Sequence, residues 1–271
     1  MRKPSLRVER ELQREGFAVV AGMDEVGRGA LAGPVSVGVV VIDQSCRSGP
    51  IGLRDSKLLA PRRREQLVAP VRRWALAWGV GHASALEIVA VGILGALRRA
   101  GRRALATTGV RPDVVLLDGK HDWLNDPARD GLLAFAESDG PDGGRQKLPP
   151  VRTLVKADMR CSSVAGASVL AKVERDAAMV EFARTHSAYG WEINKGYAAP
   201  EHRRALLRSG PCVLHRRSWN LTGMPERMSE ALTGPAGALR DGADDIGEVA
   251  ADAGHEWAMM GVPIDVEVIR G

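Results

Sequence analysis

Short apolar runs of strand length are the feature that most constrains the fold of this chain. The longest, residues 35–42 (VSVGVVVI), has the length and composition of a buried strand and is too short to span a membrane. A glycine-rich turn connects it to the preceding run, which predicts a hairpin. We expect strands at residues 17–24, 33–43, 77–82, 114–117 and 153–155.

Segments of helical periodicity separate these runs. Residues 61–78 begin with proline and carry apolar residues at helical spacing. Residues 86–106 also carry apolar residues at helical spacing, with a break near Gly92. Further helices are predicted over 163–186, where the first half is small and apolar, and over 200–209. Strands that alternate with helices predict an α/β domain.

Composition excludes several classes of protein. The three cysteines are far apart and form no Cys-x-x-Cys or Cys/His ligand spacing, which argues against a disulfide framework or a structural zinc site. The basic N-terminus is not followed by the apolar segment of a secretion signal, and no run of 18 apolar residues follows. We therefore expect a soluble, cytoplasmic protein that does not bind membranes.

Charge is distributed unevenly along the chain. Residues 226–271 hold ten acidic residues and three arginines, a net charge of −7, whereas residues 1–225 hold 35 basic and 23 acidic residues, a net charge of +12. A basic body suggests a polyanionic partner, although arginines that merely solvate helix faces would give the same count. Residues 226–271 are also rich in Gly and Pro, so we predict a domain over 1–225 followed by a flexible acidic tail.

Four carboxylates follow predicted strands. Asp24 and Glu25 follow the first strand, Asp118 follows the run at 114–117, and Asp158 follows the run at 153–155. Carboxylates that meet at one sheet edge repel one another unless a cation binds them, and oxygen ligands suit Mg²⁺ or Mn²⁺. Taken singly, Asp118 could instead belong to a turn and Asp158 to a helix start.

A basic glycine turn comes directly after the acidic pair. In Gly27-Arg28-Gly29 the arginine lies between two glycines, and the backbone N–H groups of such a turn can approach a phosphate closely. Carboxylates for a cation beside a turn for a phosphodiester indicate metal-assisted chemistry on nucleic acid.

The segment 21–35 (AGMDEVGRGALAGPV) closely resembles the N-terminal signature of the type 2 ribonucleases H, the bacterial ribonuclease HII family. The resemblance covers about residues 17–220. It continues in order through 55–58 (DSKL), 117–119 (LDG), 156–158 (KAD), 167–176 (ASVLAKVERD), 195–197 (KGY) and 215–218 (HRRS). It implies an α/β fold with a ribonuclease H-like mixed β-sheet flanked by helices and a C-terminal helical extension.

The resemblance also implies roles for individual residues. Asp24, Glu25, Asp118 and Asp158 match the four catalytic, metal-binding carboxylates, with Mn²⁺ or Mg²⁺ as cofactor. Gly27, Arg28 and Gly29 match the loop that contacts the ribonucleotide 2′-OH, the group that distinguishes RNA from DNA. Tyr197 matches the aromatic residue that packs on the next sugar. Ser56 and Lys57 are candidates for phosphate contact, although a lysine on a turn is more often solvated.

Two segments depart from the family pattern. Residues 121–149 form a polar Gly/Pro/Asp-rich insertion, which leaves Asp122, Asp126 and Asp130 as competitors of Asp158 for the fourth carboxylate. The tail after about Met224 carries no family motif. His202 and His215 lie in basic surroundings, but a metal-activated water needs no histidine base, so a structural role is favoured for both.

The resemblance implies a monomeric endoribonuclease that uses two metal ions. It would cut 5′ to ribonucleotides in RNA–DNA hybrids and at single ribonucleotides in duplex DNA, as in ribonucleotide excision repair, leaving 3′-hydroxyl and 5′-phosphate ends. The alternatives are an enzyme that prefers long hybrids, a non-catalytic nucleic-acid-binding protein, and a metal enzyme acting on small phosphorylated molecules. The presence of all four carboxylates argues against the second alternative, and the basic body argues against the third.

Overall fold

The computed structural model describes residues 3–125 and 148–223. Most of the predicted insertion and all of the predicted acidic tail lie outside these residues. The chain forms two compact units. Unit 1 comprises Met1–Arg28, Val35–Ala83 and Ile93–Arg175, and unit 2 comprises Gly29–Pro34, Ser84–Gly92 and the chain from Asp176 onward.

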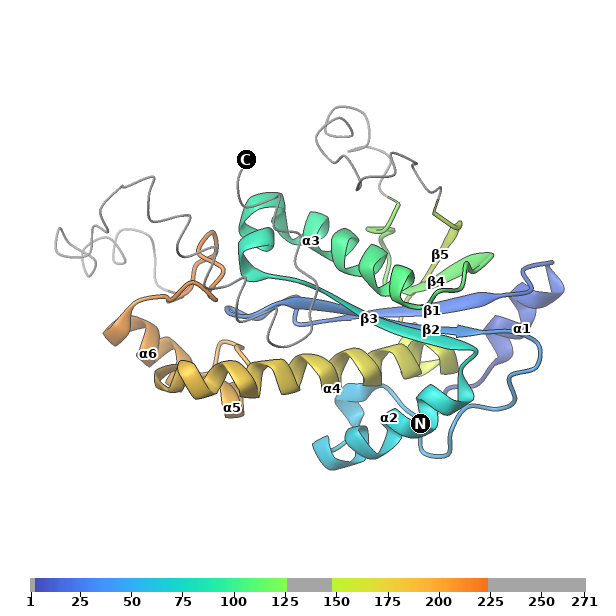
Figure 1. The fold of residues 1–271 in the computed structure, drawn as a ribbon, viewed down its shortest axis with the longest axis horizontal. Coiled ribbons are helices and arrows are strands. Elements are labelled where there is room, and N and C mark those ends of the chain that lie inside the picture. The colour runs from blue at the N-terminus through green and yellow to red at the C-terminus, as the bar shows by residue number, and fades with distance from the viewer. Residues whose placement is uncertain (1–2, 126–147, 224–271) are drawn as a thin grey trace. The chain divides into compact units, whose positions relative to one another are not determined.

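A five-stranded mixed sheet forms the centre of unit 1 (Figure 1). The strand order is β3-β2-β1-β4-β5, and the strands are β1 (Val20–Val26), β2 (Val35–Ile42), β3 (Ala77–Ala83), β4 (Val114–Asp118) and β5 (Val151–Leu154). The expected hairpin is confirmed, because β1 and β2 pair antiparallel with Val20 opposite Ile42.

Three neighbouring strands of the sheet run parallel and end together. β4 pairs parallel to β1 with Met23 beside Leu117, and β5 pairs parallel to β4 with Asp118 beside Leu154. The residues that follow β1, β4 and β5 therefore leave the sheet at one edge. This register determines where the candidate site can form.

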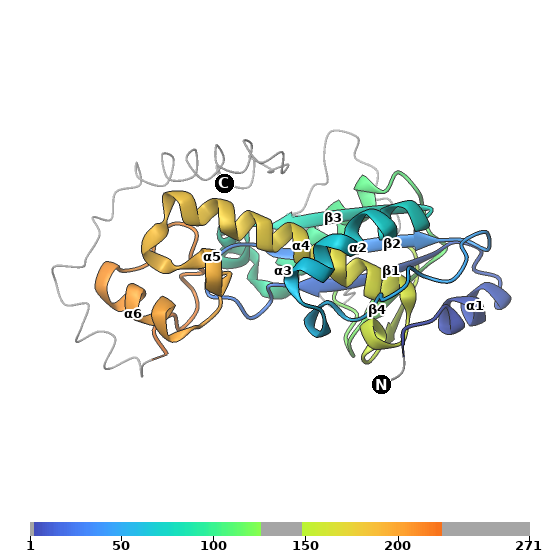
Figure 2. The same cartoon turned by 90° about the horizontal axis from the view of Figure 1, so that it is seen from below.

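Helices cover both faces of the sheet in unit 1. α2 (Pro61–Trp74) and the first half of α4 (Ser162–Thr185) lie on one face, and residues 93–107 of α3 (Ala85–Thr107) lie on the other (Figures 1 and 2). α3 is broken at Gly92, with a φ of 72°, as predicted. α2 is shorter than predicted, because residues 77 and 78 pair with β2 instead of continuing the helix.

Among the described residues, two helices, α1 (Arg7–Arg14) and the four-residue α5 (Trp191–Asn194), have no counterpart in the sequence-based prediction. α1 (Arg7–Arg14, RVERELQR) contains few apolar residues, so its periodicity is weak. A tertiary contact holds it: the buried Glu9 carboxylate accepts hydrogen bonds from Ser163 N (2.9 Å) and Ser163 Oγ (2.8 Å) at the start of α4.

α4 approaches the sheet closely because the facing residues are small. A Cβ added to Gly22 would lie 2.4 Å from Ser163 Oγ, and one added to Gly38 would lie 2.2 Å from the Ala167 carbonyl oxygen. Both distances are shorter than real Cβ contacts, so only glycine allows this approach. Gly38 pairs with Asp24, and α4 therefore packs directly beside a candidate site residue.

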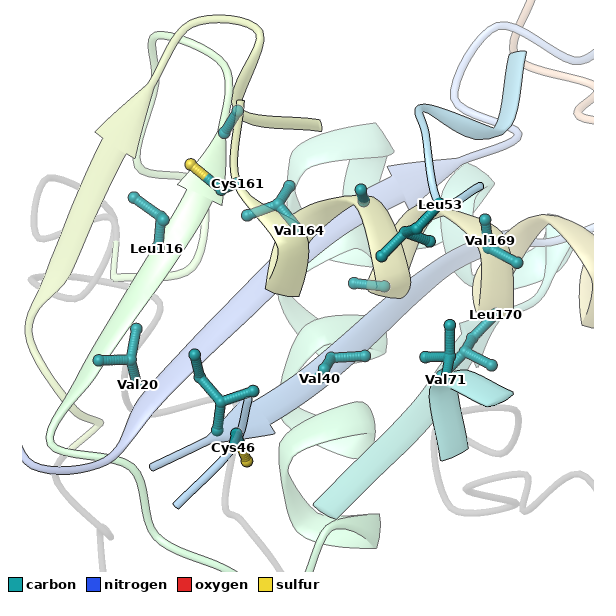
Figure 3. Close-up of a cluster of buried hydrophobic side chains, with 14 of the residues drawn as sticks. Val20, Val40, Cys46, Leu53, Val71, Leu116, Cys161, Val164, Val169 and Leu170 are labelled. Atoms are coloured by element: carbon teal, nitrogen blue, oxygen red, sulfur yellow. The ribbon is translucent and has the colours of Figure 1, made fainter. Parts of the chain in front are cut away.

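The core between α4, α2 and the sheet is aliphatic (Figure 3). Val164 and Leu170 of α4 pack with Val20 and Val40 of the sheet and with Val71 of α2. All five side chains are fully or almost fully buried. This continuous packing makes the sheet edge a rigid support for the side chains that follow the strands.

Unit 2 is mainly helical. It holds the end of α4, a short 3₁₀ turn η3 (Ser187–Tyr189), α5 (Trp191–Asn194) and α6 (Pro200–Ser209), as the predicted C-terminal helical extension requires. Its core includes Trp191 and Phe182, and an isolated bridge pairs Ala32 with His215. Within the described ranges, no helix combines the length and apolar character needed to cross a membrane.

Candidate active site

The four candidate carboxylates lie at the ends of the three parallel strands. Asp24 and Glu25 are near the end of β1, and Asp118 is the last residue of β4. Asp158 belongs to η2 (Ala157–Met159), the 3₁₀ turn that follows β5. Because Met23 and Leu117 are register partners, Asp24 and Asp118 leave the sheet at the same level.

Backbone geometry fixes Asp158 relative to Asp118. Asp118 Oδ1 accepts a hydrogen bond from Ala157 N at 2.6 Å, which ties the end of β4 to the segment after β5. Lys156 has a φ of 57°, a conformation that residues other than glycine rarely adopt. Such strain is maintained only where surrounding contacts require it, and here it turns the chain so that Asp158 is buried beside Asp118.

Burial and mutual repulsion raise the pKa values of these carboxyl groups. Asp24 is 3% exposed, and burial, with the charges of Glu25 and Asp118, raises its pKa well above the usual value. Burial also raises the pKa of Glu25, and Asp118 adds to this. Burial, Asp118 and Asp55 together raise the pKa of Asp158 to about 6. The site therefore concentrates negative charge that a cation would stabilise.

Lys57 contributes a basic side chain to this cluster. Its Nζ lies 3.9 Å from Asp158 Oδ2, and its side chain is 71% exposed. Burial alone would lower the Lys57 pKa, but Asp24, Asp55, Asp158 and Asp118 outweigh it and raise the pKa. Lys57 therefore stays protonated while its ammonium group remains accessible to a ligand.

Two hydroxyl groups extend the cluster on the α4 side. Ser168 forms a side-chain hydrogen bond to Asp24, which partly offsets the rise in the Asp24 pKa. The Ser168 and Ser56 hydroxyls are 2.8 Å apart, and both side chains are buried. Sequence reasoning missed Ser168, whose only local signal is a hydroxyl within the small, apolar first half of α4.

The donor set fits a divalent cation. Glu25 Oε2 is buried and has no hydrogen-bond partner, an arrangement that is costly without a cation. Across residues 3–125 and 148–223, no group of three His, Cys, Asp or Glu side chains is arranged to hold a metal ion by itself. Mg²⁺ does not need such a cage, because it keeps several waters and binds through one or two carboxylates plus substrate phosphate.

The glycine turn begins against a buried arginine. Gly27 has a φ of 83°, and a Cβ at this position would lie 2.1 Å from Arg175 Nε, so the turn packs on the side chain of Arg175. Arg175 is fully buried, and sequence reasoning did not single it out. Arg28 Nη1 lies 3.4 Å from Glu25 Oε1, with half of the Arg28 side chain exposed.

Gly29 and Tyr197 belong to unit 2. Nothing lies within 4 Å of a Cβ added to Gly29, so its surroundings are open. Tyr197 is half-buried and follows two residues with positive φ, Lys195 and Gly196. The Gly196 carbonyl accepts hydrogen bonds from Leu31 N (2.8 Å) and Ala32 N (3.3 Å), which connects the turn before Tyr197 to the segment after the glycine loop.

The structure therefore separates the predicted site residues into two groups. Unit 1 holds eight of them at or beside the parallel strand ends: Asp24, Glu25, Asp118, Asp158, Ser56, Lys57, Gly27 and Arg28. Of the competing carboxylates, Asp122 accepts hydrogen bonds from Leu124 N and Asn125 N, as a turn residue does. Asp126 and Asp130 lie outside the described residues.

Comparison with known proteins gives a consistent match. The family model described as Ribonuclease HII matches residues 21–222. A relative from Streptomyces coelicolor, named Ribonuclease HII, is 45% identical over 217 residues, which cover 80% of this chain and 83% of the relative.

Solved structures share the fold. The ribonuclease H2 from Pyrococcus horikoshii aligns with a TM-score of 0.57 at 27% identity and covers 75% of this chain and 95% of its own. The Bst ribonuclease HIII solved in complex with Mn²⁺ aligns with a TM-score of 0.55 at 18% identity, covering 76% of this chain and 68% of its own. At that identity the second likeness concerns the fold alone.

Proposed function

This chain belongs to the ribonuclease HII family and is a nuclease, and we propose that it hydrolyses the phosphodiester 5′ to ribonucleotides in RNA–DNA hybrids and at single ribonucleotides in duplex DNA. The observation that carries the proposal is the convergence of Asp24, Asp118 and Asp158 at the adjoining ends of β1, β4 and β5. The unpartnered, buried Glu25 Oε2 adds a fourth donor.

Asp24, Glu25, Asp118 and Asp158 would hold Mn²⁺ or Mg²⁺. When bound there, a pair of such ions would supply an activated water and a positive charge for the leaving oxygen of a phosphodiester. The protein contributes an acidic, partly buried edge whose carboxylates are held by strand register, by the Asp118–Ala157 hydrogen bond and by Ser168. The Mn²⁺ of the related ribonuclease HIII structure agrees with this choice of metals.

At a single ribonucleotide in duplex DNA, the position of the cut explains why water must be the nucleophile, because the preceding deoxynucleotide has no 2′-OH. A ribonucleotide's 2′-OH lies next to its own 3′-phosphate and cannot attack the phosphodiester on its 5′ side. Water attack on phosphorus breaks the bond to the 3′ oxygen of the preceding nucleotide. The products are therefore a 3′-hydroxyl and a 5′-phosphate, and the 2′-OH serves for recognition.

Substrate selection is assigned to the glycine loop and Tyr197. Gly27, Arg28 and Gly29 would contact the 2′-OH and the neighbouring phosphates, and the packing of Gly27 on Arg175 supports a fixed loop conformation. Tyr197 would pack on the sugar of the following deoxynucleotide. Ser56 and Lys57 would contact phosphate, and the exposed, protonated Lys57 ammonium suits that role.

Cleavage of a defined duplex tests this function. We expect wild-type protein with Mn²⁺ or Mg²⁺ to cut a labelled DNA duplex that contains one ribonucleotide, immediately on its 5′ side. An all-DNA duplex of the same sequence should remain intact, because it lacks the 2′-OH. Cleavage of long hybrids without cleavage of the single-ribonucleotide duplex would instead assign the enzyme to hybrid removal.

The proposal includes a catalytic domain over residues 1–225 that acts as a cytoplasmic monomer, with residues 226–271 as an acidic tail. The tail's net charge of −7 against +12 suggests that it competes with DNA for the basic body. Deleting 226–271 should then tighten binding to duplex DNA and steepen its dependence on salt, because more phosphate contacts form. Equal affinity and an equal salt slope, measured by fluorescence anisotropy, would rule out this competition.

A further inference from the structure

A buried hydrogen-bond network in unit 2 ends on the backbone of Tyr197. His202 Nδ1 lies 2.8 Å from the Tyr197 carbonyl oxygen, and His202 Nε2 lies 3.1 Å from His215 Nε2. Trp191 Nε1 donates to His202 Nε2 at 3.2 Å. His202 and Trp191 are 0% exposed and His215 is 1% exposed, so the network is shielded from bulk solvent.

The partners determine which ring nitrogens carry hydrogen. A carbonyl oxygen only accepts and an indole N–H only donates, so His202 carries its hydrogen on Nδ1 and accepts at Nε2. His215 must then donate from Nε2, which leaves its Nδ1 to accept from Cys212 N at 3.0 Å. Both histidines are therefore neutral, each as one defined tautomer.

Burial agrees with this assignment. It lowers the pKa of His202, and together with His202 it lowers the pKa of His215 to about 3. Protonation of His202 at Nε2 would place its N–H against the His215 Nε2–H, and protonation of His215 at Nδ1 would place an N–H against the Cys212 N–H. The network therefore has one satisfied arrangement around neutral pH.

We propose that His202 is a positioning residue for substrate selection, whose Nδ1–H bond to the Tyr197 carbonyl orients Tyr197 toward the sugar that follows the ribonucleotide. The inference rests on the proposed function, from which it takes the role of Tyr197. The Tyr197 carbonyl also accepts from Ala199 N at 2.8 Å, and Tyr197 N donates to the Asn194 carbonyl at 3.0 Å. His202 is the side chain that connects this backbone to the buried core.

The turn before Tyr197 is strained, so the Tyr197 backbone depends on support such as the hydrogen bond from His202. Lys195 and Gly196 both have positive φ, and a Cβ at Gly196 would lie 2.5 Å from the Ala32 carbonyl oxygen. Tyr197 therefore follows a strained turn packed on the segment after the glycine loop. The hydrogen bond from His202 fixes the backbone on the C-terminal side of this turn.

Two conservative variants separate positioning from stability. In His202→Asn the amide nitrogen is bonded to Cγ, as Nδ1 is, so the donor to the Tyr197 carbonyl is kept. In His202→Gln the amide group lies one bond further out, so its oxygen can accept in place of Nε2 and the donor to Tyr197 is lost. Both variants should lower the unfolding temperature, because each leaves part of the buried network unpaired.

The readout is the ratio of cleavage at a single ribonucleotide in duplex DNA to cleavage of a uniform RNA–DNA hybrid. We expect His202→Gln to lower this ratio about tenfold, the upper effect of one lost hydrogen bond, and His202→Asn to keep it within about twofold. In a Tyr197→Ala background, His202→Gln should lower the ratio no further. Equal ratios for the Asn and Gln variants would overturn the inference.

Two further results keep the test decisive. Imidazole ¹⁵N shifts of the wild-type protein should show His202 with hydrogen on Nδ1, and hydrogen on Nε2 would overturn the inference even if His202→Gln failed to fold. If Tyr197→Ala alone leaves the ratio unchanged, the assigned role of Tyr197 fails. A Tyr197→Ala effect without an Asn–Gln difference refutes only the role of His202.

Discussion

Replacing Asp118 by asparagine should reduce cleavage of the single-ribonucleotide duplex by about 1,000-fold or more without loss of the fold. Asparagine keeps an oxygen that can accept the Ala157 N–H bond now made by Asp118 Oδ1, so the connection between β4 and η2 survives. The variant loses the charge that would hold the metal. Metal stabilisation of the transition state is worth several kcal/mol, and each 1.36 kcal/mol is a factor of ten in rate.

Thermal unfolding distinguishes lost chemistry from lost structure in this variant. Asp118 repels Asp24, Glu25 and Asp158, so its neutralisation should leave the metal-free unfolding temperature unchanged or raise it. The rise in that temperature on adding Mn²⁺ should become smaller, because a weaker ligand set stabilises the folded state less. If Asp118→Asn cleaved the duplex at the wild-type rate, the assigned site would be refuted.

Asp122→Asn is the matched control for Asp118→Asn. Asp122 is a nearby carboxylate whose hydrogen bonds to Leu124 N and Asn125 N are those of a turn, and asparagine can accept both. We expect its cleavage rate to stay within about twofold of wild type. A loss as large as that of Asp118→Asn would indicate that Asp122, within the insertion, is the fourth metal-binding carboxylate in place of Asp158.

Replacing Gly27 by alanine should lower cleavage about 10- to 100-fold. Its φ of 83° disfavours any side chain, and the new Cβ would meet Arg175 at 2.1 Å from Nε. Strain of this kind costs about 1–3 kcal/mol, and Arg175 is fully buried, so the loop rather than the arginine is expected to shift. The shift would displace the backbone that contacts the ribonucleotide. The resulting loss of cleavage rate is measured under single-turnover conditions.

Gly109→Ala isolates the cost of the backbone conformation alone. Gly109 has a φ of 63°, and nothing lies within 4 Å of its added Cβ. Both alanine variants should lower the unfolding temperature, but only Gly27→Ala should lose activity. Equal activity of the two variants would show that the conformation of the glycine turn does not matter for cleavage.

Most of the sheet could be predicted because its signals are local. Strand-length apolar runs such as residues 35–42 and 114–117 became β2 and β4, and α6 begins and ends at the predicted residues. α1 could not be predicted, because it is stabilised by the burial of Glu9 against Ser163, a residue far away in the sequence. The overlong prediction for α2 has a similar cause, since pairing with β2 takes residues 77 and 78 into β3.

The candidate site also contains some residues that the sequence indicated and others that it did not. Asp24, Glu25, Asp118 and Asp158 were recognisable because each lies at or just after the end of a predicted strand and matches a family motif. Ser168 and Arg175 were not, because their importance depends on what they touch: the Asp24 carboxylate in one case and the Gly27 backbone in the other. No local pattern marks a serine or an arginine in a helix as the neighbour of a residue some 150 positions away.

The sequence by itself determined the strands, the helices α2, α3, α4 and α6, the candidate carboxylates and the family, because period, turn residues and motif order are properties of short segments. Only the tertiary structure decided that β1, β4 and β5 are parallel neighbours and that His202 and His215 share one buried hydrogen-bond network. The physical reason is that register, burial and proton placement depend on groups that are distant along the chain. They acquire partners only when helices and strands pack together.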